Sequence, residues 1–518
     1  MTAPLFLGLD VGTSGVKAIL VAPNGDVEGA VTAPLPLSTP QPGWAEQDPN
    51  DWWRATCSAL GQLLGSGGAS RVVAVGLSGQ MHSSVFLDRA GQVIRPALLW
   101  CDGRTTEECI EITRRAGGEV HLREWVRNPA LEGFTLPKVL WLRDREPDAY
   151  RRLATVLLAK DFIRFRLTDA LATEPSDASG TLMFDPARLR WSEEILAAVG
   201  VPRALLPEVG GSSEILGRLT AEAAQRTGLL VGTPVVGGGA DNACGAAGVG
   251  VVAAGEAVAS WGTSGTVLAP TAKPLVDPGL RAHTFCHVVP NVWYLMGVVL
   301  SAGGAFTWYR EHFARELPEA ALASKTLDAE AATVEAGARG VTFLPYLQGE
   351  RTPHRNASAR GAFLGLSLAH TRAHLTRAVL EGIAFALRDS LSILRELGMT
   401  PARLLLTGGG ARSAFLRQLQ ADVFGLPVIT VNREEGPAYG AALLASVGAG
   451  AYPDLAAATQ ATLGRSAPQH PNEAVQEAYR EAYARFRSSY RAAQPTASCE
   501  EGNDAPDSRA GSATVHQS

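Results

Sequence analysis

One short pattern occurs twice in the chain, as Asp10-Val11-Gly12-Thr13-Ser14-Gly15-Val16-Lys17 and as Ser260-Trp261-Gly262-Thr263-Ser264-Gly265-Thr266-Val267. Each copy lies between two apolar runs, so the shared Gly-Thr-Ser-Gly is expected at the tip of a β-hairpin. The copies fall near the starts of two halves of the chain, which favours an internal duplication over a chance match. We therefore place a domain boundary in the small-residue stretch 248–256.

Short apolar runs alternate with helix-length segments along the chain, which is typical of an α/β protein. Helical spacing puts Leu416, Leu419 and Val423 on one apolar face. The expected strands are Leu5–Leu9, Val16–Val21, Val72–Leu77, Pro234–Val236 and Leu404–Thr407, and the expected helices are Asp51–Leu64, Leu375–Leu397 and Ala414–Phe424.

The length of 518 residues exceeds what one ordinary hydrophobic core supports. We expect a first domain over residues 1–250 and a second over residues 251–490. Residues 494–518 are rich in Ser, Ala, Asp, Glu and Gly and contain almost nothing apolar to bury. That composition predicts a disordered tail that can be removed without loss of stability or rate.

Composition also excludes several classes of partner. The net charge of −5 is small for this length, so neither a nucleic-acid partner nor a membrane surface is indicated. The N-terminus lacks the features of a signal peptide, and no run of eighteen apolar residues predicts a spanning helix. The six cysteines form no C-x-x-C pair, which favours reduced thiols in a cytoplasmic enzyme.

The two hairpin tips are candidate phosphate-binding sites. A tight turn with two glycines exposes consecutive backbone N–H groups, and hydroxyls add further donors. One such tip alone would be read as an ordinary turn, but two facing tips favour a clamp for a polyphosphate. The residues concerned are Gly12, Thr13 and Ser14 in the first tip, with Gly262 and Thr263 in the second.

Two acidic residues follow short strands. Asp10 ends the first strand, where its carboxylate could hold Mg²⁺ through water or could simply stabilise the turn. Asp241 follows the small residues 237–240 and could act as the general base in phosphoryl transfer. From the residues alone, a role for Asp241 as the cap of the following helix is equally well supported.

A second glycine-rich segment suggests where a nucleotide would bind. Gly408, Gly409 and Gly410 stand between a predicted strand and a helix, an arrangement common in nucleotide sites. Gly303 and Gly304 could also admit a nucleotide, although close helix packing explains them equally well. The chain has no P-loop motif and no protein-kinase motif set, so neither of those nucleotide-binding classes applies.

A polar loop, Ser78-Gly79-Gln80-Met81-His82, follows the predicted strand Val72–Leu77, at a position where α/β proteins bind ligands. The His82 imidazole offers a donor and an acceptor to a sugar hydroxyl, and Met81 offers an apolar wall. A lone histidine is more often structural. Trp100-Cys101-Asp102-Gly103-Arg104 combines an aromatic ring with a charge pair. A purely structural interpretation of the same residues is a buried Trp with a surface salt bridge.

Together these motifs resemble the FGGY family of carbohydrate kinases, within the actin-like ATPase superfamily, from about Leu5 to Tyr490. The segment 133–142, which begins Gly-Phe-Thr-Leu-Pro-Lys, resembles the first family signature, and segments 361–366 and 374–382 resemble the second. The loop ending in Met81-His82 resembles the xylulokinase form. Ser83 departs from that form, which often has Gly there.

The resemblance implies two RNase-H-like domains with a central cleft, and ATP bound mainly to the second half. It implies that Asp241 is the base, that Asp10 supports Mg²⁺, and that Met81, His82, Asp241 and Asn242 contact the sugar. The implied reaction converts D-xylulose to D-xylulose 5-phosphate. The alternatives are a kinase of ribulose, gluconate or glycerol, and a non-catalytic actin-like nucleotide switch. The sequence leaves open whether the protein forms a homodimer.

Overall fold

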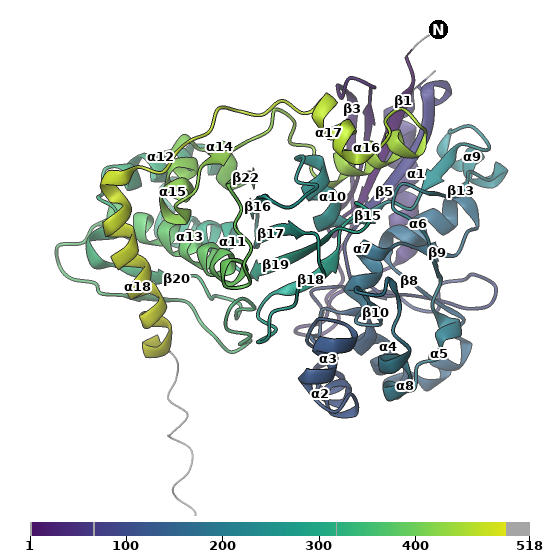
Figure 1. Ribbon diagram of the computed structural model, residues 1–518, viewed down its shortest axis with the longest axis horizontal. Helices are drawn as coiled ribbons and strands as arrows, with labels where there is room; N and C mark the ends of the chain where they lie inside the picture. The colour runs from purple at the N-terminus through teal and green to yellow at the C-terminus, as the bar shows by residue number, and fades with distance from the viewer. Residues whose placement is uncertain (1–2, 66–67, 318, 494–518) are drawn as a thin grey trace, which may run out of the picture.

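The computed structural model describes residues 3–65, 68–317 and 319–493, and the predicted tail 494–518 lies outside them. Two α/β bodies, each built on its own β-sheet, make up the molecule (Figure 1). No helix in the described part of the chain is long and apolar enough to cross a membrane. The five cysteines within that part, Cys57, Cys101, Cys109, Cys244 and Cys286, are all free thiols.

The sheet of the first half has the strand order β13-β14-β5-β1-β2-β3, with β15 paired to β5. The hairpin partners β1 and β2 are antiparallel, as are β2 and β3, whereas β5 lies parallel to β1 and β14 parallel to β5. The bounds are β1 Leu5–Val11, β2 Gly15–Val21, β3 Val27–Pro34, β5 Val72–Gly79, β13 Ile215–Arg218, β14 Pro234–Val236 and β15 Gly239–Ala240.

The sheet of the second half repeats this arrangement in the order β18-β19-β17-β16-β22-β23. Again two antiparallel pairs, β16 with β17 and β17 with β19, are followed by two parallel pairs, β16 with β22 and β22 with β23. The bounds are β16 Glu256–Trp261, β17 Gly265–Thr271, β18 His283–Cys286, β19 Trp293–Val299, β22 Arg403–Gly408 and β23 Val428–Ile429.

These two sheets confirm the internal duplication that the repeated motif predicted. In each half the Gly-Thr-Ser-Gly tip joins the first two strands of the sheet, between β1 and β2 and between β16 and β17. Each predicted strand and helix exists, with ends that differ by a few residues. The predicted apolar face of α15, Ala414–Phe424, is buried at Leu416, Leu419 and Val423.

Helices cover both faces of the first sheet. On one face α1 packs against β2 and β3, and on the other α16 packs against β1 and β5 and contacts α10. The bounds are α1 Pro49–Leu64, α6 Ala159–Thr168, α9 Ala221–Thr227, α10 Asp241–Gly248, α16 Pro437–Gly448 and α17 Leu455–Thr462. The chain therefore returns to the first sheet at residue 437. A single division of the chain at residue 250 places α16 in the second domain, although this helix packs on the sheet of the first. Close approach requires the glycine at Gly76, because a Cβ there would lie 1.8 Å from the Ala441 carbonyl oxygen.

In the second half the long helix α13 packs against β17 and β19, with α12, α15 and α18 outside it. The bounds are α11 Gly303–Phe313, α12 Ala320–Ala332, α13 Arg372–Glu396, α14 Gly409–Arg412, α15 Ala414–Phe424 and α18 Gln476–Ala493. Seventeen residues of α13 are buried, because this helix is covered on several sides.

A group of shorter helices extends the first half on the side away from α1. It includes α2, α3, α4, α5 and α8 (Figure 1), and the short helix α7 lies beside β15. The bounds are α2 Thr106–Arg115, α3 Glu119–Trp125, α4 Thr135–Arg145, α5 Pro147–Arg152, α7 Pro175–Ala178 and α8 Glu193–Val199. Asn128, after α3, joins this group to the second half, since its side-chain amide donates to the Thr284 carbonyl at 2.8 Å.

Candidate active site

A pocket of about 730 Å³ lies beside the second hairpin. Gly262, Thr263, Gly303, Gly409 and Gly410 all line it, so these five predicted nucleotide residues share one cavity. Its other walls combine apolar and charged side chains, among them Phe306, Phe415, Arg310, Lys325 and Asp328. A cavity of this size, with apolar walls and a few polar groups, is typical of a small-molecule site.

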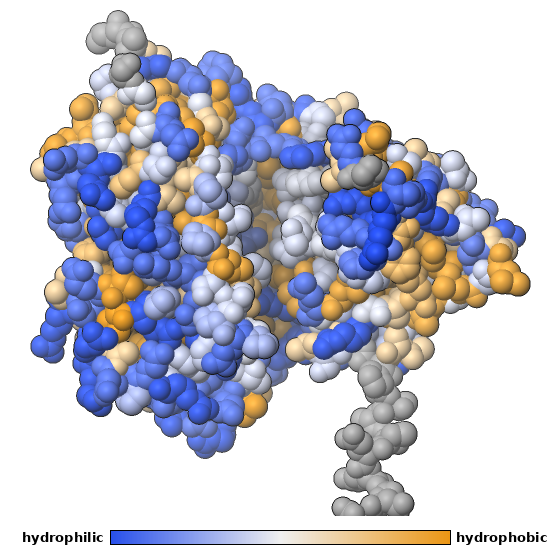
Figure 2. All heavy atoms as spheres, turned by 180° about the vertical axis from the view of Figure 1, so that it is seen from behind, coloured by the Kyte–Doolittle hydropathy of each residue, from blue (hydrophilic) through white to orange (hydrophobic). Residues whose placement is uncertain are grey.

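A second pocket of about 330 Å³ adjoins the first, because both include Arg412 in their walls. Asp241 and Asn242 line it from the first half, and Ser260 and Gly408 line it from the second. Figure 2 shows the surface hollowed between the two halves. The predicted base therefore lines a pocket that shares a wall, at Arg412, with the predicted nucleotide pocket.

Side chains of the first half hold the first hairpin tip. The Thr13 hydroxyl donates to Gln80 Oε1 at 3.1 Å and accepts from Trp100 Nε1 at 3.0 Å. The Thr13 carbonyl accepts from Gln47 Nε2 at 2.7 Å, and the Gly12 amide donates to the Gly15 carbonyl at 3.0 Å. Thr13 is thus connected directly to the loop that carries Met81 and His82. Ser14 is exposed at the tip.

Backbone groups of α11 hold the second tip instead. The amides of Ala302 and Gly304 donate to the Thr263 carbonyl at 3.0 and 2.9 Å, and the Gly303 amide donates to the Gly262 carbonyl at 2.8 Å. A Cβ at Gly303 would lie 2.5 Å from the Gly262 carbonyl oxygen, so only glycine permits this approach. Gly303 and Gly304 therefore support the tip by close packing, and Gly303 also lines the pocket.

Glycines between β22 and α15 allow a similar approach to the second hairpin. Gly408 has φ +76°, and a Cβ on it would lie 2.6 Å from the Trp261 carbonyl oxygen. A Cβ on Gly410 would lie 2.8 Å from the Trp261 Cβ. These glycines let the floor of the nucleotide pocket come close to the second hairpin. They thus have a packing role in addition to the predicted contact with a nucleotide.

Asp241 is the first residue of α10, and Ala240 occupies the N-cap position. Asp241 Oδ1 accepts from the backbone and side-chain amides of Asn242, at 2.7 and 2.9 Å. Among the described residues, the Asp241 carboxylate forms no capping hydrogen bond with a later amide of α10. Loss of hydration, and then the charge of Asp10, raise the pKa of Asp241 to about 7. A carboxylate with a pKa near neutrality is suited to general-base catalysis.

Asp10 is the last residue but one of β1 and lies beside Ser78 of β5. Burial raises the pKa of Asp10 to about 6, although the Ser78 hydroxyl and the Lys17 ammonium oppose the rise. Its Oδ1 is buried and accepts no hydrogen bond from any residue that the structure describes. The described residues contain no cluster of three His, Cys, Asp or Glu side chains that could hold a metal alone. A single carboxylate with an unused oxygen fits Mg²⁺, which commonly takes one carboxylate together with water and phosphate oxygens.

His82 adopts an unusual backbone conformation, with φ +69°. The carbonyl of this residue accepts from Thr135 Oγ1 at 3.1 Å and from Lys138 Nζ at 3.2 Å, and Lys138 Nζ also donates to the Gly133 carbonyl at 2.6 Å. The segment that resembles the first family signature therefore holds His82 in place. A conformation that most residues avoid is maintained in this way by its surroundings.

The imidazole of His82 has one nitrogen already engaged. His82 Nδ1 lies 2.5 Å from the Gly180 carbonyl oxygen, so Nδ1 carries the proton and donates. Burial lowers the pKa of His82 well below its usual range, and the charges of Lys138 and Arg351 lower it further. The neutral ring therefore offers an acceptor at Nε2. With Nδ1 engaged by Gly180, Nε2 is the ring nitrogen left for a ligand.

Met81 brings the loop close to the predicted base. Its sulfur accepts from Asn242 Nδ2 at 3.6 Å and from the Tyr294 hydroxyl at 4.0 Å. Ser83, where the resemblance departs from the pattern, is buried and donates its hydroxyl to Gln80 Oε1 at 3.1 Å. The structure thus brings Met81 and Asn242 into contact and turns the Ser83 hydroxyl toward Gln80.

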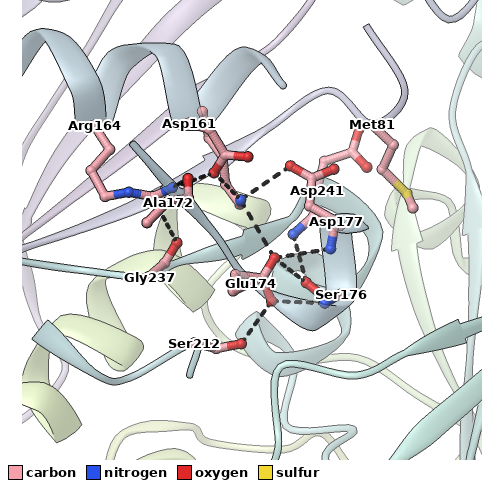
Figure 3. A network of polar contacts seen from close by, with 12 residues as sticks. Met81, Asp161, Arg164, Ala172, Glu174, Ser176, Asp177, Ser212, Gly237 and Asp241 are labelled. Atoms are coloured by element: carbon pink, nitrogen blue, oxygen red, sulfur yellow. Dashed lines mark hydrogen bonds and ion pairs between the residues drawn. The ribbon is translucent and has the colours of Figure 1, made fainter. Parts of the chain in front are cut away.

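A buried polar network fixes the backbone before Asp241 (Figure 3). The Ala240 amide donates to Ser176 Oγ at 2.9 Å, and Ser176 Oγ donates to Glu174 Oε1 at 2.8 Å. The other Glu174 oxygen accepts from Ser212 Oγ at 2.9 Å. Two hydrogen bonds in series, through Ser176, therefore connect the residue next to the predicted base with a fully buried carboxylate.

The same network contains two cations from α6. Lys160 Nζ lies 2.7 Å from Asp161 Oδ1 and 3.2 Å from Asp177 Oδ2, and Arg164 Nη1 donates to the Gly237 carbonyl at 2.9 Å. Burial raises the pKa of Asp177, despite the attraction of Lys160. The loop 237–240 is thus held at both ends. No sequence motif singled out Lys160 or Arg164, because their role depends on segments far apart in the chain.

In the segment that begins at Trp100, the charge pair is buried, whereas the structural interpretation of the sequence placed it on the surface. Asp102 and Arg104 form an ion pair at 2.7 Å, and both side chains are buried, so this is no surface salt bridge. Arg104 also pairs with Glu46 and stacks 3.6 Å over the Trp44 ring. Trp100 itself donates to Thr13, so the aromatic residue supports the first hairpin.

Two equivalent sheets, two hairpins at one cleft and a carboxylate beside the nucleotide pocket define a two-domain phosphotransferase site. The family model for the N-terminal domain of FGGY carbohydrate kinases matches residues 5–248, and the model for the C-terminal domain matches residues 257–449. The chain belongs to the FGGY family of carbohydrate kinases.

Several known proteins are similar to most of the chain. Xylulose kinase from Bacillus subtilis is 39% identical over 93% of this chain and 96% of the relative. Xylulose kinase from Escherichia coli is 42% identical over 86% and 90%. The crystal structure of xylulose kinase from Rhodospirillum rubrum superposes with a TM-score of 0.87 at 33% identity, covering 94% of this chain and 98% of that one. These likenesses confirm the predicted two-domain fold.

Proposed function

We propose that the protein transfers the γ-phosphoryl group of ATP to the terminal hydroxyl of D-xylulose, which gives D-xylulose 5-phosphate and ADP. The single observation that carries the proposal is the position of Asp241. It lies in the pocket next to the nucleotide cavity, and its neighbour Asn242 contacts Met81. The xylulose kinases that match the chain support the choice of sugar.

In the proposed reaction Asp241 accepts the proton of the attacking hydroxyl. The hydroxyl oxygen then forms a bond to the γ-phosphorus, and the bond from that phosphorus to the bridging oxygen of ADP breaks. The backbone N–H group of Thr13 in the Gly12-Thr13 tip on one side, and those of Gly262 and Thr263 on the other, would hold the phosphate chain in line. Positioning and electrostatic stabilisation supply most of the rate in phosphoryl transfer.

Asp10 would hold Mg²⁺, which when bound neutralises charge on the phosphates. Gly408, Gly409 and Gly410 would lie along the nucleoside. Met81, His82 and Asn242 would contact the sugar, with His82 Nε2 accepting from one hydroxyl. Each of these roles is part of the proposal and rests on the geometry of the pockets and loops described above.

A substrate panel tests the proposed sugar. ADP formation is measured with D-xylulose, D-ribulose, L-ribulose, gluconate and glycerol, each with ATP and Mg²⁺. We expect the highest kcat/KM with D-xylulose. A higher value with another sugar would replace D-xylulose and leave the kinase assignment intact. ADP formation that no sugar or polyol stimulates would favour the alternative of a nucleotide switch that binds a protein partner.

His82→Ala tests the sugar side of the site. Loss of the Nε2 acceptor should lower kcat/KM for D-xylulose by about 1–3 kcal/mol in transition-state free energy, because a buried hydroxyl then lacks its partner. The KM for ATP should change little. An equal loss for every sugar and for ATP would mean that His82 only maintains the fold of the loop.

A homodimer and a cytoplasmic location stay predictions of the sequence. They enter no step of the proposed reaction, which needs only the two halves of one chain.

A further inference from the structure

One side chain of the second half reaches the sugar side of the first. Arg351 follows Glu350, whose Oε1 accepts from the Arg351 amide at 2.7 Å and from the Leu300 amide at 3.2 Å. The next residue, Thr352, donates its amide to the Val298 carbonyl at 3.1 Å. The loop that carries Arg351 is therefore fixed to the end of β19, close to the second hairpin.

The guanidinium lies against the first half, beside Gly133. Arg351 Nη2 is 2.9 Å from the position that a Cβ on Gly133 would occupy, and the Trp100 carbonyl oxygen is equally close to that position. Glycine is thus the residue that leaves room for this side chain. The segment that begins at Gly133 also holds the His82 carbonyl through Lys138. Arg351 therefore lies among the residues that surround His82.

The Arg351 guanidinium forms no hydrogen bond and no ion pair within the described part of the chain. Other arginines near the cleft differ in this respect, since Arg355 pairs with Glu119 and Arg281 with Asp277. Arg351 is partly buried, and burial lowers the pKa of its guanidinium although the charges of Glu132 and Glu350 oppose the change. A partly buried guanidinium that makes no hydrogen bond has N–H donors available, so it is expected to meet an acceptor from a ligand.

We propose that Arg351 binds an oxygen of the sugar substrate and so makes the sugar contact both halves of the molecule. The inference rests on the proposed function. Hydroxyl and carbonyl oxygens are acceptors, and a guanidinium presents several N–H donors in a planar fork. Gly133, beside the guanidinium, and His82, whose pKa the Arg351 charge lowers, are both on the sugar side. The predicted phosphate ligands instead lie on the two hairpins.

The test compares Arg351→Gln and Arg351→Lys with the control Arg360→Gln. Arg360 is an exposed arginine nearby whose guanidinium bonds only to the carbonyls of Ala357 and Ala359 in its own loop. Kinetics are measured on whichever sugar the wild-type protein uses best, together with the KM for ATP. Binding of that sugar without nucleotide is measured by calorimetry.

We expect Arg351→Gln to lower kcat/KM for the sugar about 10- to 100-fold, mainly through KM, since a charged hydrogen bond is lost. Arg351→Lys should lose less, because it keeps the charge without the fork. The KM for ATP and the behaviour of Arg360→Gln should stay within about twofold of wild type, the scatter that a change of less than 0.5 kcal/mol allows. Unchanged sugar kinetics in Arg351→Gln would overturn the proposal, as would an equal loss for sugar and ATP.

A second variant keeps the proposal testable if Arg351→Gln does not fold. Gly133→Ala retains the arginine but places a methyl group 2.9 Å from its Nη2. It should weaken sugar binding and spare ATP binding, whereas normal sugar binding by a folded Gly133→Ala protein with a displaced guanidinium would overturn the proposal. The wild-type substrate panel decides the identity of the sugar separately. Failure of D-xylulose as substrate is therefore distinguishable from failure of Arg351 as its ligand.

Discussion

The two Gly-Thr-Ser-Gly hairpins have the same fold and different surroundings. The first stands beside charged side chains, Asp10 before the tip and Lys17 after it, and Lys17 forms an ion pair with Glu435 at 2.6 Å. At the equivalent places the second has Ser260 and Val267. Side chains of the first half hold the first tip, whereas the backbone of α11 holds the second.

This difference indicates how a duplicated unit came to serve two roles. Both tips offer backbone N–H groups, which suit a polyphosphate. The first has Asp10 beside it, and the charge of Asp10 raises the pKa of Asp241. Only the second opens on the large pocket that Gly409 and Gly410 line. We infer that the chemistry belongs to the first half and nucleotide binding mainly to the second.

The largest expected effect tests whether the chemistry belongs to the first half. Asp241→Asn keeps the shape of the side chain but removes the proton acceptor, so turnover should fall roughly 10²–10⁴-fold. ATP binding, measured by calorimetry, should persist because the nucleotide pocket is unchanged. A variant that keeps a large fraction of wild-type turnover would exclude Asp241 as the base and favour a structural role at the start of α10.

The next effect compares equivalent positions of the two hairpins. Asp10→Asn should lower kcat at saturating ATP by roughly 10²-fold, because a carboxylate that holds Mg²⁺ supplies several kcal/mol. Ser260→Ala, at the equivalent place, should change kcat by less than about threefold. Mg²⁺ titrations of both variants check the difference. Equal losses at the two positions would break the asymmetry proposed above.

The pH dependence of the wild-type protein follows from the same asymmetry. The base must be deprotonated, and the pKa of Asp241 is raised to about 7, so kcat/KM should rise with pH and level off above that value. Well below it, each pH unit should change the rate about tenfold. A profile measured from pH 5 to 9 checks this. A flat profile through pH 6–7 would contradict the raised pKa.

The smallest effect concerns the support of the second tip. Gly303→Ala places a Cβ 2.5 Å from the Gly262 carbonyl oxygen, so the tip and α11 must separate. We expect the KM for ATP to rise about 3- to 10-fold, which corresponds to about 1 kcal/mol, the lower end of what overpacking costs, with little change for the sugar. Gly61→Ala in α1 is the matched control, since a Cβ there meets nothing within 4 Å. An unchanged KM for ATP would mean that the tip tolerates the displacement.

Much of the fold could be predicted from local signals. The repeated tips, the glycines around residue 409 and the loop ending at His82 are contiguous, so a single stretch of sequence reveals each. The return of α16 to the first sheet could not be read in this way, because an Ala-rich helix packs equally well on either sheet. Its partner was decided by small residues on both sides, including Gly8 and Gly76, whose missing side chains admit α16.

The same distinction between local sequence signals and tertiary structure applies to the candidate site. Residue type and order determined the chemistry available: carboxylates at Asp10 and Asp241, backbone donors at two tips, and an imidazole at His82. Only the tertiary structure decided how they act. It engaged His82 Nδ1 with Gly180, put Asp10 near enough to raise the pKa of Asp241, and brought Arg351 across to Gly133. Hydrogen bonds, desolvation and charge depend on distances of a few ångströms between segments far apart in the chain, and sequence spacing does not encode those distances.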